Sequence, residues 1–349
     1  MRATKRLALL GLAVLLLVSL PALLLPAERL AEQTEGRMKN VWLAAGSPAP
    51  VSTVRRAAAE QAPAAETPAL PASEDADALF SIPASAVMES LSPDEIRETT
   101  ISGGLILKNE TEYDVDVGRL LLDGPSLRLP AEGAQILILH THASEAYTQA
   151  GLDRYEANDV SRTADTEFNI VRVGDELTAL LEQAGLRVIH DREIYDYPSY
   201  TGSYTRSGAA VERILQEHPE ITVVIDMHRD ALGANGVVYK TMAEEDGTVA
   251  SQVMLLAGSD GSGLEHPAWR ENLALALYLQ DAVGRVHPTL MRPVALVNQR
   301  YNQHLRPGFL ILEVGSSGNT LQEALAAIRL FAEGAAPALL KLVEGSEDA

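Results

Sequence analysis

The sequence predicts an α/β domain with a mostly parallel, twisted sheet flanked by helices, and three observations carry this prediction. Short apolar segments that suit buried strands alternate with segments whose apolar residues recur at helical spacing. Such alternation is typical of strands joined by helical crossovers. Histidines and carboxylates also follow two of the apolar segments directly. Ligands of open α/β sheets bind at the carboxyl ends of the strands, so we expect the functional site there.

The N-terminal residues 1–25 predict a membrane anchor with a short cytoplasmic stub. Three basic residues precede 7–25, a run without charge that is long enough to span a bilayer core. A cleaved signal peptide is the alternative, but the run is longer than a signal-peptide core and no clear small-residue cleavage site follows. Basic residues keep this end in the cytoplasm. We therefore expect a single-pass protein of the cell membrane whose remainder lies on the extracytoplasmic, cell-wall side.

The rest of the chain divides into three parts. Residues 26–91 are rich in Ala and Pro and predict a disordered tether, because they bury too little apolar surface to offset chain entropy. Residues 92–130 predict a small extension packed on the main domain, with a helix that begins at Ser92 and short strands within 103–109 and 119–125. The main domain spans 131–345.

Charge and composition exclude several classes of site. The 349 residues carry 28 basic and 48 acidic side chains, a formal net charge of -20, which argues against nucleic acid as a partner. The chain has no cysteine. Disulfides and cysteine zinc sites are therefore excluded, and any metal must be held by His, Asp, Glu or water.

Within the main domain, the elements follow from apolar patterning and from helix-ending residues. Strands are predicted within 136–139, 186–191, 221–230, 253–259, 293–299 and 308–313, the last followed by a Gly/Ser turn. Helices are predicted within 163–186, 209–217, 269–286 and 321–340, the last with a kink or split at Gly334 and Pro337.

Two of these strands end in groups that suit a metal site. Four apolar residues lead into His140 and His142, and Glu145 follows. The strand within 221–230 repeats this arrangement and ends in Asp226, His228, Arg229 and Asp230. Imidazole is a common metal ligand and needs a neighbouring carboxylate or carbonyl to fix its tautomer. Because two strands carry histidines at the same edge, we expect these side chains to lie together.

A third strand ends in Glu313, which follows four apolar residues and is costly to bury without a partner. A carboxylate beside a metal-bound water would have such a partner and would serve as a general base. Other histidines are weaker candidates, because His190 ends a strand and His218, His266 and His287 each precede a proline. His304 is intermediate, since its loop precedes the Glu313 strand.

Six segments, in order, carry a resemblance to a known family: HTHASEAY, NIVRVGDEL, GSYTRS, VVIDMHRDA, RYNQHLRPG and LILEVGSSGNTLQEAL. Over residues 101–340 the chain resembles the stage II sporulation protein P family of peptidoglycan hydrolases. The resemblance implies an N-acetylmuramoyl-L-alanine amidase with additional endopeptidase activity on stem-peptide cross-links, acting on septal or engulfment cell wall in sporulating bacteria. It also implies the stage II sporulation proteins D and M as partners.

More distantly, the chain is similar to zinc amidases of the amidase 3 type. That resemblance implies Zn²⁺ held by His140 or His142, by Glu167 and by His228, with Glu313 as the catalytic residue. The chain has HTHAS where those enzymes have Gly-His-Gly-Gly. The choice between the two histidines therefore stays open, with His142 favoured because it lies beyond the strand end, and Glu145 competes with Glu167.

Supporting roles complete the expected site. Arg229 is expected to stabilise the oxyanion, and Asp226 or Asp230 to orient His228. We expect substrate contacts from a loop that contains Tyr301, Asn302 and His304. Two other functions remain open, a metallo-endopeptidase as the main activity and a peptidoglycan-binding scaffold without catalysis.

Overall fold

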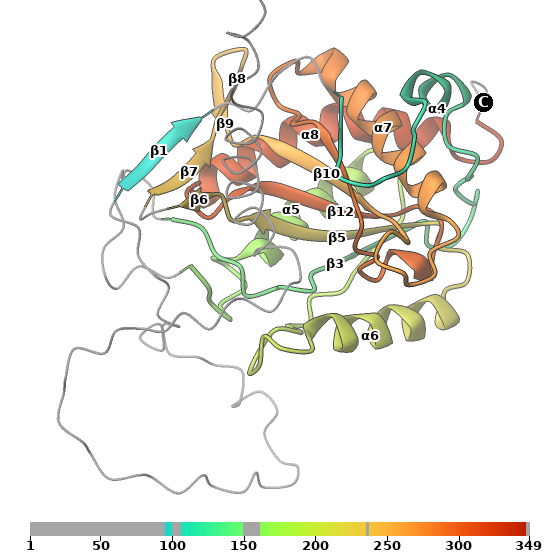
Figure 1. Cartoon of the computed structure of the whole chain (residues 1–349), viewed down its shortest axis with the longest axis horizontal. Coiled ribbons are helices and arrows are strands. Elements are labelled where there is room, and N and C mark those ends of the chain that lie inside the picture. The colour runs from blue at the N-terminus through green and yellow to red at the C-terminus, as the bar shows by residue number, and fades with distance from the viewer. Residues whose placement is uncertain (1–94, 100–105, 149–160, 235–236, 347–349) are drawn as a thin grey trace, which may run out of the picture.

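The computed structural model describes residues 95–99, 106–148, 161–234 and 237–346 (Figure 1). Its central feature is a seven-stranded sheet of order β2-β11-β10-β12-β5-β3-β4. All neighbouring pairs are parallel except β10 and β12. The predicted class, a mostly parallel sheet flanked by helices, is thus confirmed. In sheet order the strands are β2 Leu107–Asn109, β11 Val294–Val297, β10 Val253–Gly258, β12 Phe309–Ser316, β5 Val223–Asp230, β3 Ile136–Leu139 and β4 Val188–His190.

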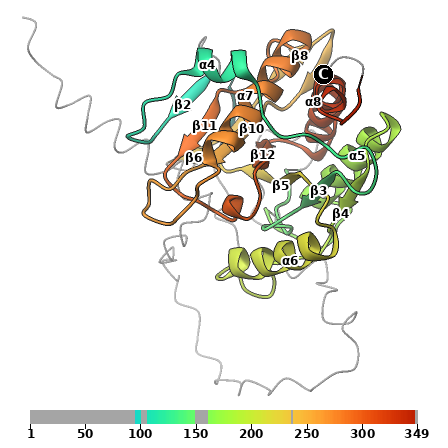
Figure 2. The same cartoon turned by 90° about the vertical axis from the view of Figure 1, so that its right-hand side faces the viewer.

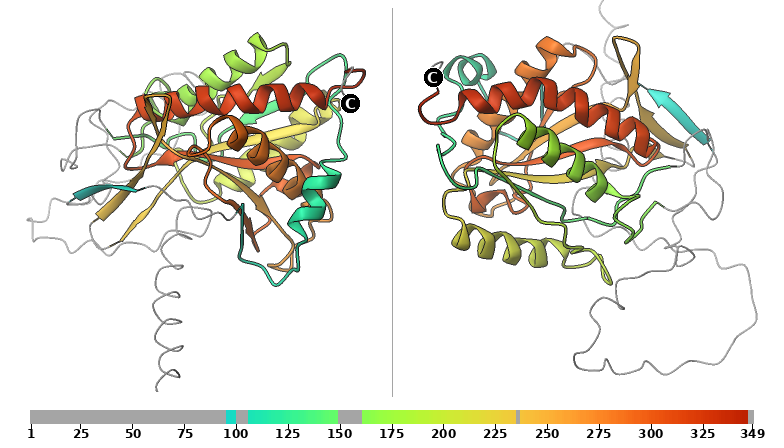
Figure 3. Two further views of the ribbon diagram at one scale, coloured as in Figure 1. Left: turned by 90° about the horizontal axis from the view of Figure 1, so that it is seen from above. Right: turned by 180° about the vertical axis from the view of Figure 1, so that it is seen from behind.

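Helices cover the two faces of this sheet unequally. One face packs on α5 (Ile170–Gln183), α7 (Trp269–Val286) and α8 (Leu321–Lys341), and α5 and α8 lie side by side in the rear view (Figure 3). The other face carries α6 (Ser203–Glu217), which packs on β3 and β5 (Figure 2). The β10 and β11 half of that face holds only a small apolar cluster, Leu256, Ala295, Val297 and Ile311. A pocket can therefore form over this half of the sheet.

Alternation along the strands decides which side chains reach which face. Ile136 and Ile138 enter the core below α5, α7 and α8, whereas Leu137 and Leu139 pack under α6. Successive strand residues point to opposite faces, so the parity of a residue within its strand predicts its side.

Two predicted elements in the extension are wrong. Residues 119–125 do not form a strand, because most of them belong to the helix α4 (Val117–Asp123), whose first turn is capped by Asp116 through the Arg119 amide. The helix predicted to begin at Ser92 does not continue past residue 94, since Glu95–Thr99 forms β1. Strand β1 pairs in parallel with β7 (Val237–Thr241), and this pairing overrides the local helix signal.

The α8 helix runs unbroken through Gly334 and Pro337, against the expected kink or split. A Cβ atom at Gly334 would lie 2.6 Å from the Cα atom of Val283. Position 334 thus needs glycine because α7 and α8 approach closely there. The glycine reflects the packing of these two helices and does not end α8.

A β-arm between β5 and β10 was not predicted. It contains β6 (Gly233–Ala234), β7, β8 (Ala243–Glu245) and β9 (Thr248–Ala250). Strands β8 and β9 form a hairpin whose turn residues, Asp246 and Gly247, both have positive φ, as Asp-Gly hairpin turns require. Among the helices within the described residues, none is long and apolar enough to cross a membrane. The predicted anchor 1–25 and tether 26–91 lie outside these residues.

Candidate active site

The carboxyl ends of β3, β5 and β12 bring the predicted residues His142, His228 and Glu313 to one edge of the sheet. Strands β5 and β12 are parallel neighbours, and His228 lies in register with Glu313. His142 follows β3, the neighbour of β5 on its other side. The rings of His142 and His228 meet edge to face, with centroids 5.2 Å apart.

His142 is buried without a hydrogen-bond partner on either ring nitrogen, at 1% exposure. Its ring stacks on Tyr200 at a centroid distance of 4.4 Å and meets Tyr204 edge to face. Burial holds the pKa of His142 well below its ordinary value, so the imidazole is neutral. A buried polar group usually has a partner, and a neutral imidazole with an available lone pair is the form that binds metals.

Glu145 is a buried carboxylate beside His228. Its Oε2 atom accepts a hydrogen bond of 3.0 Å from the Arg229 amide and lies 3.5 Å from His228 Nδ1. Burial alone would raise the pKa of Glu145, but the hydrogen bond to His228 and the nearby charges of His228, Arg229 and Arg162 outweigh it and lower the pKa. Glu145 is therefore ionised at neutral pH.

His228 lies between two carboxylates. Asp226 Oδ1 is 3.1 Å from His228 Nε2, opposite the contact with Glu145. Burial opposes protonation of His228, but Asp226 and Glu145 together raise its pKa well above the ordinary value. Asp226 itself accepts bonds from the amide and hydroxyl of Thr141, at 2.7 and 2.6 Å. These bonds connect the end of β3 to the end of β5.

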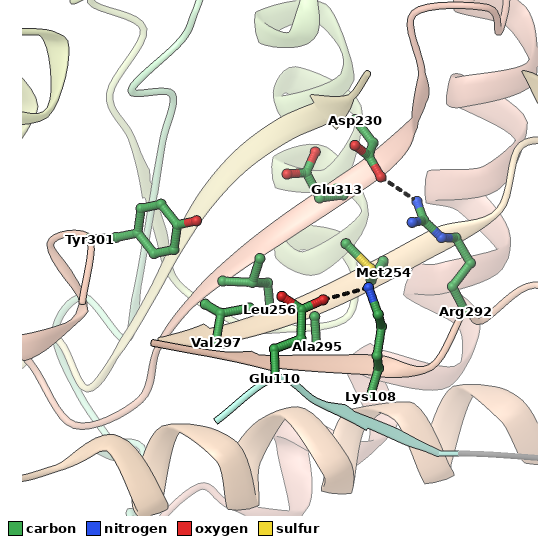
Figure 4. Close-up of a pocket in the computed structure, with 10 residues that line it drawn as sticks. All are labelled: Lys108, Glu110, Asp230, Met254, Leu256, Arg292, Ala295, Val297, Tyr301 and Glu313. Atoms are coloured by element: carbon green, nitrogen blue, oxygen red, sulfur yellow. Dashed lines mark ion pairs between the residues drawn. The ribbon is translucent and has the colours of Figure 1, made fainter. Parts of the chain in front are cut away.

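Glu313 has the opposite electrostatic character to Glu145. It is 5% exposed, and its Oε2 atom has no hydrogen-bond partner. Burial and the neighbouring charge of Asp230 raise the pKa of Glu313 to about 8. Asp230 forms an ion pair of 2.8 Å with Arg292 (Figure 4). Of these two carboxyl groups, Glu145 is thus held ionised, whereas Glu313 can hold a proton near neutral pH.

The donor set at this edge fits zinc in kind. It comprises the neutral imidazole of His142, the carboxylate of Glu145 and the ring of His228, which would release a proton on binding a metal. Zinc binds nitrogen and oxygen ligands of these types. The unpartnered nitrogens of His142 are the observation that favours a missing ligand. In the described part of the chain, however, no three His, Asp or Glu side chains converge as a metal-binding group.

His140 points away from this cluster, although it stands two residues from His142. It shares the strand parity of Ile136 and Ile138, and its Nε2 atom lies 2.8 Å from Nε2 of His190. Its Nδ1 atom lies 3.2 Å from the Met227 carbonyl oxygen. Burial lowers the pKa of His140 to about 3. The structure thus groups His142, and not His140, with His228.

Glu145 and Glu167, the two candidates for the carboxylate ligand of the metal, differ in burial. Glu167 is exposed just before α5, in a turn where its amide donates to Asp165. Glu145 is 2% exposed and lies against His228. The buried carboxylate next to the histidines is therefore Glu145.

The guanidinium of Arg229, which was expected to stabilise an oxyanion, lies against backbone carbonyl oxygens. Its guanidinium donates to the carbonyl oxygens of Ala146 and Ser161, at 2.8 and 2.7 Å. Arg229 also follows His228 and so has the opposite strand parity. These contacts tie Arg229 to the segment that carries Glu145.

The three loop residues predicted to contact substrate, Tyr301, Asn302 and His304, lie in different surroundings. Tyr301 lines a pocket that also contains Glu313 (Figure 4). Asn302 instead donates to the Tyr204 carbonyl and the Ser207 hydroxyl, at 2.8 and 3.1 Å, and so ties the loop to α6. His304 lies in the short 3-10 helix Gln303–Leu305 and is only partly buried.

Four residues of the site were missed by the sequence reasoning: Arg162, Asp196, Tyr200 and Tyr204. Asp196 accepts from the Ser144 hydroxyl at 2.6 Å and pairs with Arg162 at 2.7 Å. The sequence does contain a pattern that indicates the two tyrosines: a segment rich in Tyr follows β4, and β4 is the neighbour of β3 in the sheet.

Comparison with known proteins gives the family. The family model of stage II sporulation protein P matches residues 80–336. Stage II sporulation protein P of Bacillus subtilis strain 168 is 27% identical over 213 residues, which cover 57% of this chain and 50% of that protein. This chain thus matches about half the length of that relative.

Two amidases are among the solved structures that match this chain. N-acetylmuramoyl-L-alanine amidase AmiC2 of Nostoc punctiforme is 15% identical, with 60% of this chain and 96% of that chain covered and a TM-score of 0.35. N-acetylmuramoyl-L-alanine amidase of Clostridium difficile 630 is 14% identical, with 60% and 97% covered and a TM-score of 0.34. Since the family model spans most of the chain, this protein belongs to the stage II sporulation protein P family.

Proposed function

We propose that this protein is a peptidoglycan hydrolase of sporulation, a zinc-dependent N-acetylmuramoyl-L-alanine amidase that cleaves the bond between the lactyl group of muramic acid and L-alanine. The observation that carries the proposal is the buried group of His142, Glu145 and His228 beside a second carboxyl group, Glu313. Membership of the family named for a stage II sporulation protein supports the cellular process.

His142, Glu145 and His228 are the residues that would hold the zinc. The ion would supply a Lewis acid for amide hydrolysis. Asp226 accepts from Thr141 and contacts His228 Nε2, so it fixes the orientation of that ring from the side opposite Glu145. Arg229 holds the Glu145 segment through the carbonyl oxygen of Ala146.

Glu313 would transfer the proton. As water attacks the lactyl carbonyl carbon, Glu313 takes a proton from it and then gives that proton to the amide nitrogen as the C–N bond breaks. The products are a free lactyl carboxyl group and a free amino group on alanine. The unpartnered Oε2 atom and the pKa of about 8 support this role, because both proton states of Glu313 are accessible near neutral pH.

A metallo-endopeptidase acting on stem-peptide cross-links is the second candidate, since the same groups hydrolyse any amide. The proposed working place is the cell-wall side of the membrane, with the chain anchored by residues 1–25. Peptidoglycan is the proposed substrate, and the stage II sporulation proteins D and M are the proposed partners through the family resemblance.

Digestion of purified sacculi by the full chain tests the proposal, with mass spectrometry of the products. An amidase releases intact stem peptides with a free N-terminal alanine. An endopeptidase cuts cross-links and leaves peptides on the glycan, and a scaffold releases nothing. Treatment with a chelator should abolish release, and added zinc should restore it. Full activity after chelation would remove zinc from the proposal.

A further inference from the structure

A small pocket lies beside Glu313, on the half of the sheet that α6 leaves free (Figure 4). Its volume is about 60 Å³, enough for a few water-sized groups. Its floor is formed by four apolar side chains from β10 and β11: Met254, Leu256, Ala295 and Val297. A floor of this kind favours an apolar group of limited size.

Charged residues surround the pocket, but they are paired with one another. Arg292 pairs with Asp230 at 2.8 Å, and Lys108 pairs with Glu110 (Figure 4). Each cation therefore has its own carboxylate, which offsets its attraction for an acidic ligand. Likewise, the pairing offsets the attraction of Asp230 and Glu110 for an ammonium group. The pocket thus suits a neutral group.

Three polar atoms of the pocket-lining residues have neither a hydrogen-bond partner nor an ion-pair partner among the described residues: Glu313 Oε2, the hydroxyl oxygen of Tyr301 and Nε of Arg292. Glu313 is 95% buried, and the Tyr301 hydroxyl points into the pocket from its loop (Figure 4). Tyr301 has a φ of 50°, which is uncommon for an aromatic residue. The Tyr301 hydroxyl can donate a hydrogen bond to a carbonyl oxygen, and the apolar floor can contact a short apolar side chain. The pocket therefore suits a ligand that carries both groups close together.

The position of Glu313 relates the pocket to the reaction, and this step rests on the proposed function. Glu313 both lines the pocket and would protonate the leaving nitrogen. Whatever fills the pocket must therefore be joined to that nitrogen through very few bonds. In a muramoyl-alanine amide, the methyl side chain of alanine is the apolar group nearest that nitrogen, and the carbonyl group of the same residue lies next to it. The lactyl methyl is one bond further away, on the acyl side of the bond that breaks.

We propose that this pocket is a specificity subsite for the residue whose amino group is released. The floor of Met254, Leu256, Ala295 and Val297 receives an alanine-sized side chain, and the Tyr301 hydroxyl donates to the carbonyl oxygen of that residue. The subsite excludes longer side chains because β10 and β11 close its floor.

Muramoyl peptides that differ only at the first residue provide the test, with glycine, alanine or leucine in that position. For the zinc-loaded full chain we expect kcat/KM for alanine to exceed that for glycine and for leucine by about 10-fold each, the usual scale for one missing or one badly fitting apolar group. Equal kcat/KM for all three substrates would overturn the subsite.

Two floor variants and one control locate the selectivity. Met254→Ala enlarges the pocket and should raise the leucine-to-alanine ratio of kcat/KM by about 10-fold. Ala295→Leu fills the pocket and should lower the alanine-to-glycine ratio by about the same factor. Leu264→Ala truncates an apolar residue that is 55% exposed and outside the pocket, and should leave both ratios unchanged. Unchanged ratios in Met254→Ala would overturn the assignment of the floor, even if Ala295→Leu failed to fold.

Tyr301→Phe tests the hydrogen bond separately. It should lower kcat/KM for the alanine and glycine substrates alike by about 5-fold, because both carry the carbonyl group. Failure of the proposed function has a different result: no variant would cleave any muramoyl peptide, whereas an endopeptidase would still cut cross-links. Cleavage of all three muramoyl peptides at one rate would leave the amidase in place and remove only the subsite.

Discussion

Glu313→Gln should stabilise the fold increasingly as the pH rises, in protein kept free of metal by a chelator. The pKa of Glu313 is raised from its ordinary value of 4.5 to about 8 in the folded protein. Between these values the folded state holds a proton that the unfolded chain releases, so stability falls as the pH rises through this window. At about 1.4 kcal/mol per pH unit, the full loss is about 5 kcal/mol, of which about 3 kcal/mol is reached by pH 7.

Glutamine carries no ionisable group, so the variant should escape this loss. The assay is urea unfolding of both proteins from about pH 3.5 to about pH 9, a range that includes both pKa values of Glu313. The free energy of unfolding of Glu313→Gln minus that of the parent should be nearly constant below pH 4.5 and should rise by several kcal/mol by pH 8. Glu167→Gln, at an exposed position, serves as the control and should give a flat difference. A flat difference for Glu313→Gln as well would refute the account of the buried carboxyl group.

Three further substitutions test the contacts around the site. Gly174→Ala should lower the free energy of unfolding by about 2 kcal/mol, measured by urea unfolding, because the new Cβ would lie 2.6 Å from His140 Nε2 and 2.8 Å from His190 Nε2. His140→Gln should keep a zinc content near that of the parent in elemental analysis, since this ring faces His190; a metal-free variant would make His140 a ligand. Arg229→Met should lower the melting temperature and reduce the free energy of unfolding by about 3 kcal/mol, because it leaves the carbonyl oxygens of Ala146 and Ser161 without their donor. An unchanged melting temperature would contradict the positioning role.

Much of the main sheet was predictable because its strands are buried and short and its helices carry a regular apolar stripe. The helix within 269–286 was predicted with the observed bounds, and the strands around Asp226 and Glu313 were found for the same reason. The extension was harder. Residues 95–99 become a strand only through pairing with β7, a partner far along the chain that local patterns do not indicate.

The site was partly predictable for a geometric reason. The strand ends were identified, but the choice between His140 and His142 depends on which face each side chain enters. His140 continues the alternation of β3 and lies with Ile138 on the face that helix α5 covers, whereas His142 has the same parity but lies beyond the end of β3, where the chain turns. Glu145 was weighed against Glu167 by motif alone. Their separation follows from burial, since the turn after β3 folds back onto His228.

Pairing across loops explains what was missed. Arg229 seemed available for catalysis because the sequence does not show that the carbonyl oxygens of Ala146 and Ser161 occupy its donors. Asp196 and Tyr200 are likewise distant from the histidines in sequence and reach them only because β4 lies next to β3.

We propose that His228 holds zinc whereas Glu313 transfers the proton, and these two roles can be separated by experiment. The most direct test is the zinc content of purified Glu313→Gln and His228→Ala, measured by elemental analysis beside the rate of stem-peptide release. Glu313→Gln should keep the zinc content of the parent and release peptides about 100-fold more slowly, the usual scale for loss of a general base. His228→Ala should lose zinc and activity together. A metal-free Glu313→Gln protein, or one with full activity, would contradict the account.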